Sequence, residues 1–354
     1  MPKEKYTFDR FLNVRSTYGP SFSPDGQKLS FLTDITGVAE VWSIPIDIHT
    51  PTPTWPEQLT FRNERVASAT YSPTAATLLI TADVGGNERT QLYTLSSDGS
   101  TFTALTTQLE IIFQFGDWSP DGTRITYSSN ERDPRYFDVY ERSLENGEVR
   151  MLLQHDGSNY ARHYSPDGRH VLVERFESNI RNRLILVDTT TGEARMLTPE
   201  MSEGPASHAF AHWSADRRGL YLLSDRGRQF LSLALLDLST TEMTYLRDES
   251  WDVEFLAVTE DGTRLALVTN ENGYSRLELF DVSAGWEAQR ELPVPALPKG
   301  VLSELTWSPD GTRLAFTLNS VNDAPDVWIW DVKEQLLWRA TRSSLGGIPQ
   351  KTFV

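Results

Sequence analysis

One pair of histidines has a spacing in this sequence that could support metal chemistry. His208 and His212 stand four residues apart, the spacing with which two histidines on one helical face bind zinc. His212, however, precedes an aromatic residue in what we expect to be a strand, and four strand residues span about 13 Å, too far to share a metal. His163 holds the equivalent place before Tyr164. Ordinary polar packing is the favoured interpretation of these histidines.

Aspartates recur within Ser-Pro-Asp-Gly sequences, at Asp25, Asp121, Asp167 and Asp310. Calcium needs six or more oxygen ligands gathered at one point, whereas each of these carboxylates stands in a separate segment. Pro, Asp and Gly are the residues that a tight turn needs, so turn formation explains the pattern better. The sequence has no Gly-x-Ser-x-Gly elbow, P-loop, dinucleotide fingerprint or cysteine. We therefore expect no metal and no other cofactor.

The Ser-Pro-Asp-Gly turns belong to a repeat that occurs seven times. Its copies begin at Phe22, Tyr71, Trp118, Tyr164, Trp213, Val258 and Trp307, with spacings of 49, 47, 46, 49, 45 and 49 residues. In each copy a short strand ends at this first residue, which is aromatic except at Val258. The turn, an apolar strand such as 313–318, a third strand such as 183–188 and a fourth such as 194–198 follow. Four short strands with turns between them predict one antiparallel blade.

We therefore expect an all-β fold, a seven-bladed β-propeller of four-stranded antiparallel blades. The expected blades lie near residues 18–61, 67–108, 114–155, 160–200, 209–249, 254–295 and 303–341, after an extension with a short helix (1–17) and before a tail (342–354). The first and last blades each contain four strands, so ring closure needs no strand exchanged between them. Because first strands lie nearest the axis, His163 and His212 would approach the central channel.

The composition predicts a soluble globular protein with an acidic charge balance. The 354 residues include 33 Lys+Arg and 49 Asp+Glu, a net charge of −16. This balance disfavours nucleic acid and anionic membrane surfaces as partners. Residues 1–10 lack the apolar segment of a signal peptide, and no apolar run is long enough for a transmembrane helix. We expect a cytoplasmic protein, with a periplasmic or secreted location as the alternative.

Two charged loops are candidate binding regions. They connect the second and third strands of blades three and four, at 128–140 and 174–184. Solvation is the ordinary state of such loops, but their side chains could bind the termini of a peptide or a partner domain. The candidates are Arg132, Arg135, Glu174, Arg175 and Arg181, together with His163 and His212 at the channel.

A short apolar stripe precedes the first blade. Phe8, Phe11 and Leu12 have the i, i+3, i+4 spacing of one helical turn within residues 7–14. The simpler interpretation is that this turn caps the propeller. The alternative is that it packs on another domain.

The repeats resemble the WD40-like blades of TolB-type proteins and of the prolyl oligopeptidase (S9) serine peptidases. Residues 128–148 and the tail 340–354 are similar to the S9 propellers in particular. In that family a seven- or eight-bladed propeller precedes an α/β-hydrolase domain with a Ser-Asp-His triad. The resemblance covers nearly the whole chain. It implies a non-catalytic propeller that packs on a hydrolase domain of the same polypeptide and admits oligopeptides while rejecting folded proteins.

The resemblance leaves the catalytic residues without counterparts, because the chain ends about where the hydrolase domain of the family would begin. The adjacent glutamate pair with which aminopeptidase members hold a substrate's amino terminus is also missing, since no Glu-Glu occurs here. Two alternatives stay open. One is a free-standing, TolB-like protein-binding propeller. The other is a self-contained propeller enzyme with a metal in the channel. That enzyme would need several inward-facing carboxylates or histidines, and His163 and His212 alone support it only weakly.

We predict that this chain by itself has no peptidase activity, because it contains neither a nucleophile elbow nor a triad. Hydrolysis of blocked peptide substrates by the purified chain should stay at the level of the buffer blank. Turnover that a serine-directed inhibitor abolishes would contradict the prediction.

Overall fold

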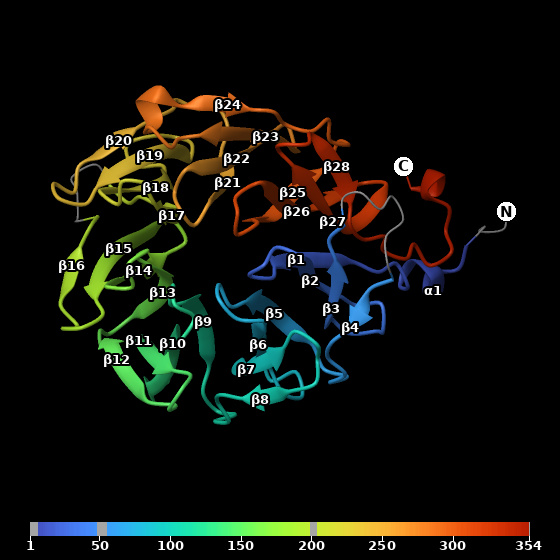
Figure 1. Cartoon of the computed structure of the whole chain (residues 1–354), viewed down its shortest axis with the longest axis horizontal. Coiled ribbons are helices and arrows are strands. Elements are labelled where there is room, and N and C mark those ends of the chain that lie inside the picture. Colours follow the sequence, from blue (N-terminus) through green and yellow to red (C-terminus); the bar gives the residue numbers. More distant parts are fainter. Residues whose placement is uncertain (1–5, 48–54, 199–203, 354) are drawn as a thin grey trace.

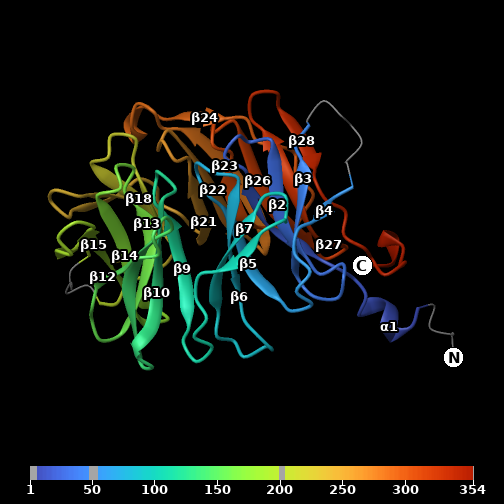
Figure 2. The same ribbon diagram turned by 60° about the horizontal axis from the view of Figure 1, so that its bottom comes forward.

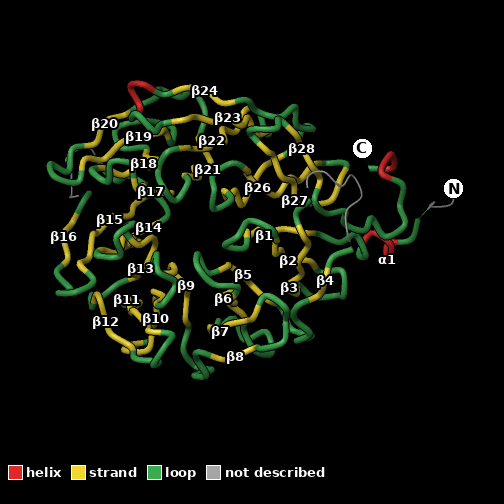
Figure 3. Tube along the Cα trace, viewed as in Figure 1, coloured by secondary structure: helices red, strands yellow, loops and turns green. Residues whose placement is uncertain are grey.

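The described chain is built almost entirely of β-strands. The computed structural model describes residues 6–47, 55–198 and 204–353, and within them the chain forms 28 strands, one α-helix and two 3-10 helices. The sheets are arranged around a common centre (Figure 1), and the helical segments are short and peripheral (Figure 3). Four-stranded antiparallel sheets recur around this centre, which confirms the predicted all-β class and matches a propeller. None of the helices in the described ranges is long and apolar enough to cross a membrane.

The first strand of each four-strand unit lies closest to the centre. These strands are β1 (Thr17–Phe22), β5 (Val66–Tyr71), β9 (Phe113–Trp118), β13 (Ser158–Tyr164), β17 (His208–Trp213), β21 (Val253–Val258) and β25 (Val301–Trp307). Each ends at the residue with which the sequence repeat begins. The prediction that this residue terminates the first strand is confirmed.

The remaining strands follow in chain order, and each pairs antiparallel with the one before it. The second strands are β2 (Lys28–Thr33), β6 (Thr77–Ala82), β10 (Arg124–Asp133), β14 (His170–Ser178), β18 (Gly219–Ser224), β22 (Arg264–Glu271) and β26 (Arg313–Ser320). The third strands are β3 (Glu40–Pro45), β7 (Gln91–Ser96), β11 (Tyr136–Ser143), β15 (Arg181–Asp188), β19 (Ser232–Asp237), β23 (Tyr274–Asp281) and β27 (Asp323–Asp331). The fourth strands are β4 (Glu57–Gln58), β8 (Phe102–Ala104), β12 (Val149–Leu153), β16 (Ala194–Met196), β20 (Met243–Tyr245), β24 (Arg290–Leu292) and β28 (Leu336–Arg339).

One contact joins two of these units into an eight-stranded sheet. β11 and β13 pair in parallel through Phe137 and Ser158. The strands β1–β4 and β25–β28 form four-stranded sheets of their own, as predicted. These first and last sheets share one apolar cluster, in which Phe31 and Ile44 pack with Val327 and Ile329. The first and last sheets therefore contact each other through apolar side chains, and each keeps four strands of its own.

The repeated aspartates bind groups of their own turns. Ser119 Oγ donates to Asp121 Oδ1 at 2.6 Å, and the Thr123 amide donates to the same oxygen at 3.0 Å. The Arg124 amide in turn donates to Ser119 Oγ at 2.9 Å. The hydrogen bond from Ser119 is the main reason why the pKa of Asp121 lies below its ordinary value. The interpretation of these aspartates as turn residues is confirmed.

The two ends of the described chain lie side by side. Val14 forms an isolated β-bridge with Leu345, and the Arg15 amide donates to the Ser344 carbonyl at 2.8 Å. Since neighbouring strands are antiparallel, the loops between second and third strands lie on this same side, which we name the terminal face. The α1 helix (Phe8–Phe11) and the β10–β11 hairpin project from it (Figure 2). The turns between first and second strands lie on the opposite side, the turn face.

Glycines of the repeated turns differ in how closely they approach the neighbouring sheet, which provides a matched test of sheet-to-sheet packing. Gly26 and Gly262 have φ angles of +66° and +72°. A Cβ at Gly262 would lie 2.5 Å from the Ala215 backbone nitrogen, whereas a Cβ at Gly26 would have no atom within 4 Å. Gly26→Ala should therefore lower the free energy of unfolding by about 1–2 kcal/mol, solely because alanine is strained in the left-handed backbone conformation.

We predict that Gly262→Ala lowers the free energy of unfolding by about 2 kcal/mol more than Gly26→Ala does, because the added methyl group collides with the backbone of the neighbouring sheet. Urea unfolding of both variants beside the parent chain measures the two losses. Equal losses would mean that the turns of neighbouring sheets are not packed as tightly as described.

Candidate functional site

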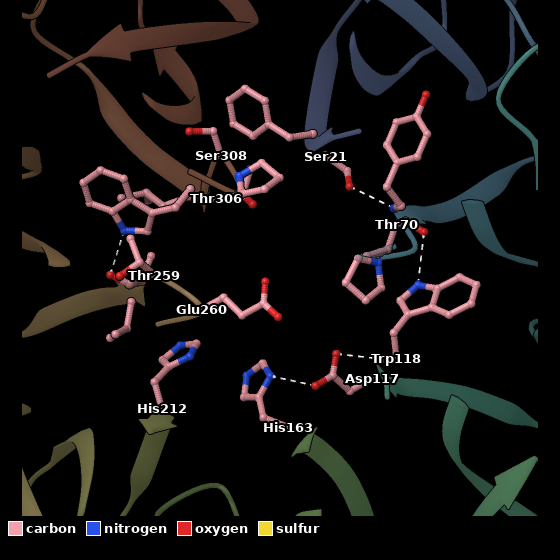
Figure 4. A pocket seen from close by; sticks show the side chains of 18 of the residues that line it. Ser21, Thr70, Asp117, Trp118, His163, His212, Thr259, Glu260, Thr306 and Ser308 are labelled. Carbon is pink, nitrogen blue, oxygen red and sulfur yellow. Dashed lines mark hydrogen bonds and ion pairs between the residues drawn. The ribbon is translucent and has the colours of Figure 1, made fainter. Parts of the chain in front are cut away.

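A cavity of about 670 Å³ lies on the turn face, where the seven first strands end. In every copy of the repeat, the residue directly before the first residue of the copy lines this cavity. These seven equivalent residues form a ring (Figure 4). The members of this ring are Ser21, Thr70, Asp117, His163, His212, Ala257 and Thr306. The volume falls within the range of small-molecule binding pockets. This cavity is our candidate functional site.

Asp117 is held in the ring by hydrogen bonds from its own four-strand unit and from the next one along the chain. Its Oδ1 accepts the Trp118 amide at 2.9 Å, and its Oδ2 accepts the Tyr164 amide at 3.0 Å. The same Oδ2 lies 3.5 Å from Nδ1 of His163. Asp117 therefore connects two neighbouring four-strand units and orients one imidazole toward the cavity.

His163 and His212 meet face to face at this cavity. Their ring centroids are 4.7 Å apart and the ring planes are inclined by 30°. Burial, reinforced by the neighbouring His163, lowers the pKa of His212 to about 3, although a hydrogen bond with the Leu256 backbone acts in the opposite direction. His212 is thus neutral at physiological pH. The predicted approach of both histidines to the centre is what the structure shows, while their binding role stays a prediction.

His208 does not join this group. It is buried between β17 and β18, where its Nδ1 lies 3.1 Å from Ser224 Oγ. Burial and the nearby Arg226 lower the pKa of His208 to about 4. The spacing of His208 and His212 therefore reflects strand positions and not a shared ligand site. The described parts of the chain contain no group of three or more His, Cys, Asp or Glu side chains that could hold a metal ion.

Glu260 enters the cavity from the turn after β21. In five other copies the equivalent turn position is a proline that also lines the cavity, namely Pro24, Pro73, Pro120, Pro166 and Pro309. The Glu260 carboxylate points into the open middle, toward Asp117 and His163 (Figure 4). Burial, with Asp117 and Asp261 as further causes, raises the pKa of Glu260.

Neither Asp117 nor Glu260 was among the predicted site residues. Asp117 could have been found from its place in the repeat, because it stands directly before Trp118 as His163 stands before Tyr164. Glu260 could have been found as the carboxylate that replaces a turn proline. Both signals are departures from the repeat and not motifs in themselves.

The predicted arginines of the β10–β11 hairpin lie on the terminal face, away from the histidines. Arg132 Nε donates to Asp138, which is fully buried, and its Nη2 donates to Asp156 at 3.1 Å. Arg135 pairs with Asp133 at 2.8 Å within the same hairpin. These guanidinium groups therefore stabilise the hairpin and its neighbouring loop.

The candidates of the β14–β15 hairpin also have partners within the chain. Glu174 accepts hydrogen bonds from Arg162 at 2.9 and 2.6 Å. Arg175 Nε donates to Asn159 at 3.0 Å, and burial lowers the pKa of Arg175. Arg181 forms an ion pair with Glu177 at 2.6 Å. A role of these residues in binding peptides or a partner remains a prediction.

The apolar stripe before β1 is exposed. The predicted short helix is present as α1, but Phe8, Phe11 and Leu12 are 74%, 44% and 60% exposed. Phe11 contacts the edge of Phe353 in the tail, with ring centroids 6.2 Å apart. A cap on the propeller would have buried these side chains against the sheets, so the simpler interpretation was wrong.

No family model matches the chain, whereas searches of curated proteins and of solved structures find similar proteins. Dipeptidyl aminopeptidase BIII of Pseudoxanthomonas mexicana is 26% identical over 243 residues, which cover 64% of this chain and 33% of the relative. A prolyl endopeptidase structure superimposes with a TM-score of 0.74 at 12% identity, over 97% of this chain and 52% of that one. Prolyl oligopeptidase B from Galerina marginata gives a TM-score of 0.73 at 12% identity, over 97% and 53%.

These similarities confirm the predicted resemblance to the propellers of S9 peptidases. The chain spans about a third of the sequence relative and about half of the two peptidase structures. A further structure, an oligogalacturonate lyase in complex with manganese, superimposes with a TM-score of 0.67 at 16% identity, over 90% of both chains. The structural matches establish the similarity of fold.

We predict that His212 makes folding stability depend on pH. The unfolded imidazole takes up a proton near pH 6.5, whereas the folded one stays neutral down to about pH 3. The unfolded state then binds more protons between these values, so stability falls as pH is lowered through this window. Between pH 7 and pH 5, the free energy of unfolding of His212→Gln should fall by about 1–2 kcal/mol less than that of the parent chain. Urea unfolding at both pH values measures this, and equal losses would contradict it.

Proposed function

We propose that this chain is the propeller domain of an S9-type serine peptidase, in which it gates oligopeptide access to an α/β-hydrolase domain of the same polypeptide. The observation that carries the proposal is the extent of the match. Almost the whole chain, 97%, superimposes on about half of a prolyl endopeptidase. Sequence similarity to a dipeptidyl aminopeptidase supports the same family. The parent protein would be a soluble enzyme of the cytoplasm.

We propose further that the sheets form a closed ring of seven blades with the boundaries expected from the repeat. Seven first strands contribute to one cavity, which supports seven blades around one axis. The apolar cluster shared by the first and last sheets supports closure by packing. Residues 1–17 and 342–354 would then connect the ring to the remainder of the polypeptide.

The terminal face is the proposed docking surface for the hydrolase domain. Both ends of the described chain lie there, so a domain joined to either end would begin at this face. Phe8 and Leu12 expose apolar surface beside the junction, and such surface is stabilised when a partner covers it. The charged hairpins rise from the same face. Their side chains Arg132, Arg135, Glu174, Arg175 and Arg181 would form the polar rim of this interface or contact the ends of a peptide.

Gating follows from the dimensions of the cavity on the turn face. A cavity of about 670 Å³ can admit a short peptide segment, whereas a folded protein is far larger. A peptidase with this domain would therefore act on oligopeptides. The propeller contributes selection and positioning, and the chemistry belongs to the hydrolase domain.

A free-standing propeller is the second candidate. The match to an oligogalacturonate lyase covers 90% of both chains, which indicates that a chain of this extent can be a complete protein with this fold. In that case the cavity or the terminal face would bind a protein partner, as in TolB-like propellers. Recovery of a stable partner other than a hydrolase in a pull-down would favour this candidate.

The reading frame around this chain discriminates between the two candidates. We predict that it continues past residue 354 and encodes a Gly-x-Ser-x-Gly elbow followed by an acid and a histidine. The complete product should hydrolyse blocked oligopeptides and lose this activity with a serine-directed inhibitor. A stop codon directly after Val354, or a continuation without an elbow, would contradict the proposal.

A further inference from the structure

The cavity on the turn face is acidic and lacks basic side chains. Asp117, Glu260 and Glu304 contribute carboxylates to its wall, and its described lining contains neither lysine nor arginine. The stacked His163 and His212 are the remaining titratable groups near the centre, together with the more distant tyrosines of the wall. Concave surfaces that carry one sign of charge concentrate ligands of the opposite sign. The cavity therefore favours a cation over an anion.

Two of the three carboxylates already have donors. Glu304 accepts the Gly19 amide and the Thr317 hydroxyl, each at 2.7 Å. Asp117 accepts two backbone amides, as described above. Glu260, in contrast, is exposed and has no hydrogen-bond donor or cation within bonding distance among the described residues. It is the carboxylate of this cavity that lacks a partner.

Glu260 replaces the residue that suits this turn best. Proline presets the backbone for this turn position, and five other copies carry it. Glu260 instead projects into the open middle, and Asp117 across the cavity further disfavours its ionised form (Figure 4). A cationic ligand between these two groups would remove the repulsion and supply the missing donors.

Two aromatic side chains belong to the wall of the same cavity. They are Phe210 and Phe255, whose rings form an edge contact with centroids 5.5 Å apart. Phe210 is 40% exposed and has a φ angle of +51°, which is rare for a bulky residue. Ammonium and guanidinium groups are attracted to aromatic faces as well as to carboxylates. This combination suits an organic cation better than a metal ion, which would need several converging ligands.

We propose that this cavity binds a cationic group of an oligopeptide, a protonated amine or a guanidinium, with Glu260 as its ion-pair partner and Phe210 and Phe255 as its aromatic wall. Asp117 is the second carboxylate that faces the bound group. The inference rests on the proposed function and names the class of peptide that the cavity selects. The cavity admits peptides with an arginine, a lysine or a free amino terminus in preference to neutral or acidic ones.

The experiment measures peptide binding to the 354-residue chain itself by isothermal titration calorimetry at low salt. The probes are acetyl-Ala-Arg-Ala-amide, its glutamine and glutamate counterparts, and Ala-Gln-Ala-amide with a free amino terminus. We expect the arginine peptide to bind about tenfold more tightly than its glutamine counterpart. The peptide with the free amine distinguishes the amino terminus from a side chain as the source of the cation.

Two variants test the role of Glu260. Glu260→Gln removes the charge at nearly constant shape, and Glu260→Pro installs the residue of the other turns, so at least one should fold as the parent chain does by circular dichroism. Both should lose the preference for cationic peptides. Glu145→Gln, which removes an exposed carboxylate from another loop of the turn face, is the matched control and should keep it.

The outcomes separate this inference from the proposed function. Absence of a preference in the parent chain, or a preference that survives both Glu260 variants, would each overturn it. Binding is measured without a hydrolase domain, so it can succeed or fail whatever the reading frame encodes. Affinity should also fall with added salt and with decreasing pH, because protonation of Glu260 removes its charge.

Discussion

Packing between neighbouring sheets at the ends of their first strands is the contact on which the rest of this structure depends. The indole of Trp307 donates to the Ala257 carbonyl of the preceding sheet at 3.1 Å, and Trp118 reaches the Thr70 carbonyl in the same way. The glycine of the following turn contacts the preceding sheet closely in the copy that contains Gly262, which lies against Ala215. Each sheet is buried on both faces by such contacts, which is why strands with little polar–apolar alternation are stable here.

This constraint leaves some positions of the repeat free to vary. Where a copy has them, the aromatic residue, the serine, the aspartate and the glycine serve packing and turn geometry. The residue before the first residue of each copy lines the cavity, and there the chain places serine, threonine, aspartate, histidine or alanine. Asp117 and Glu260, with His163 and His212 between them, therefore occupy variable positions of a repeat whose other positions are structural. Charged residues of the terminal face differ, because most of them already pair within their own hairpins.

Prediction from the sequence succeeded where structure depends on residues close together in the chain. The ends of the first strands and the turn role of Asp121 followed from propensities that act over a few residues. A second recurring contact escaped notice, in which a threonine after the fourth strand accepts the amide at the start of the third. Val41 bonds to Thr60 and Val327 to Thr341 in this way, each at 2.9 Å. Its two partners are too far apart in sequence to form a visible motif.

The amino-acid sequence by itself determined the number of repeats, the strand and turn within each, and the acidic charge balance, because these depend on local residue types and on composition. Only the tertiary structure decided which side chains share a site. Asp117, His163, His212 and Glu260 are separated by 46, 49 and 48 residues, and no local rule relates them. They meet because packing of whole sheets around one centre brings equivalent positions together, and because the side chains that fill the centre can be seen only once every sheet is in place.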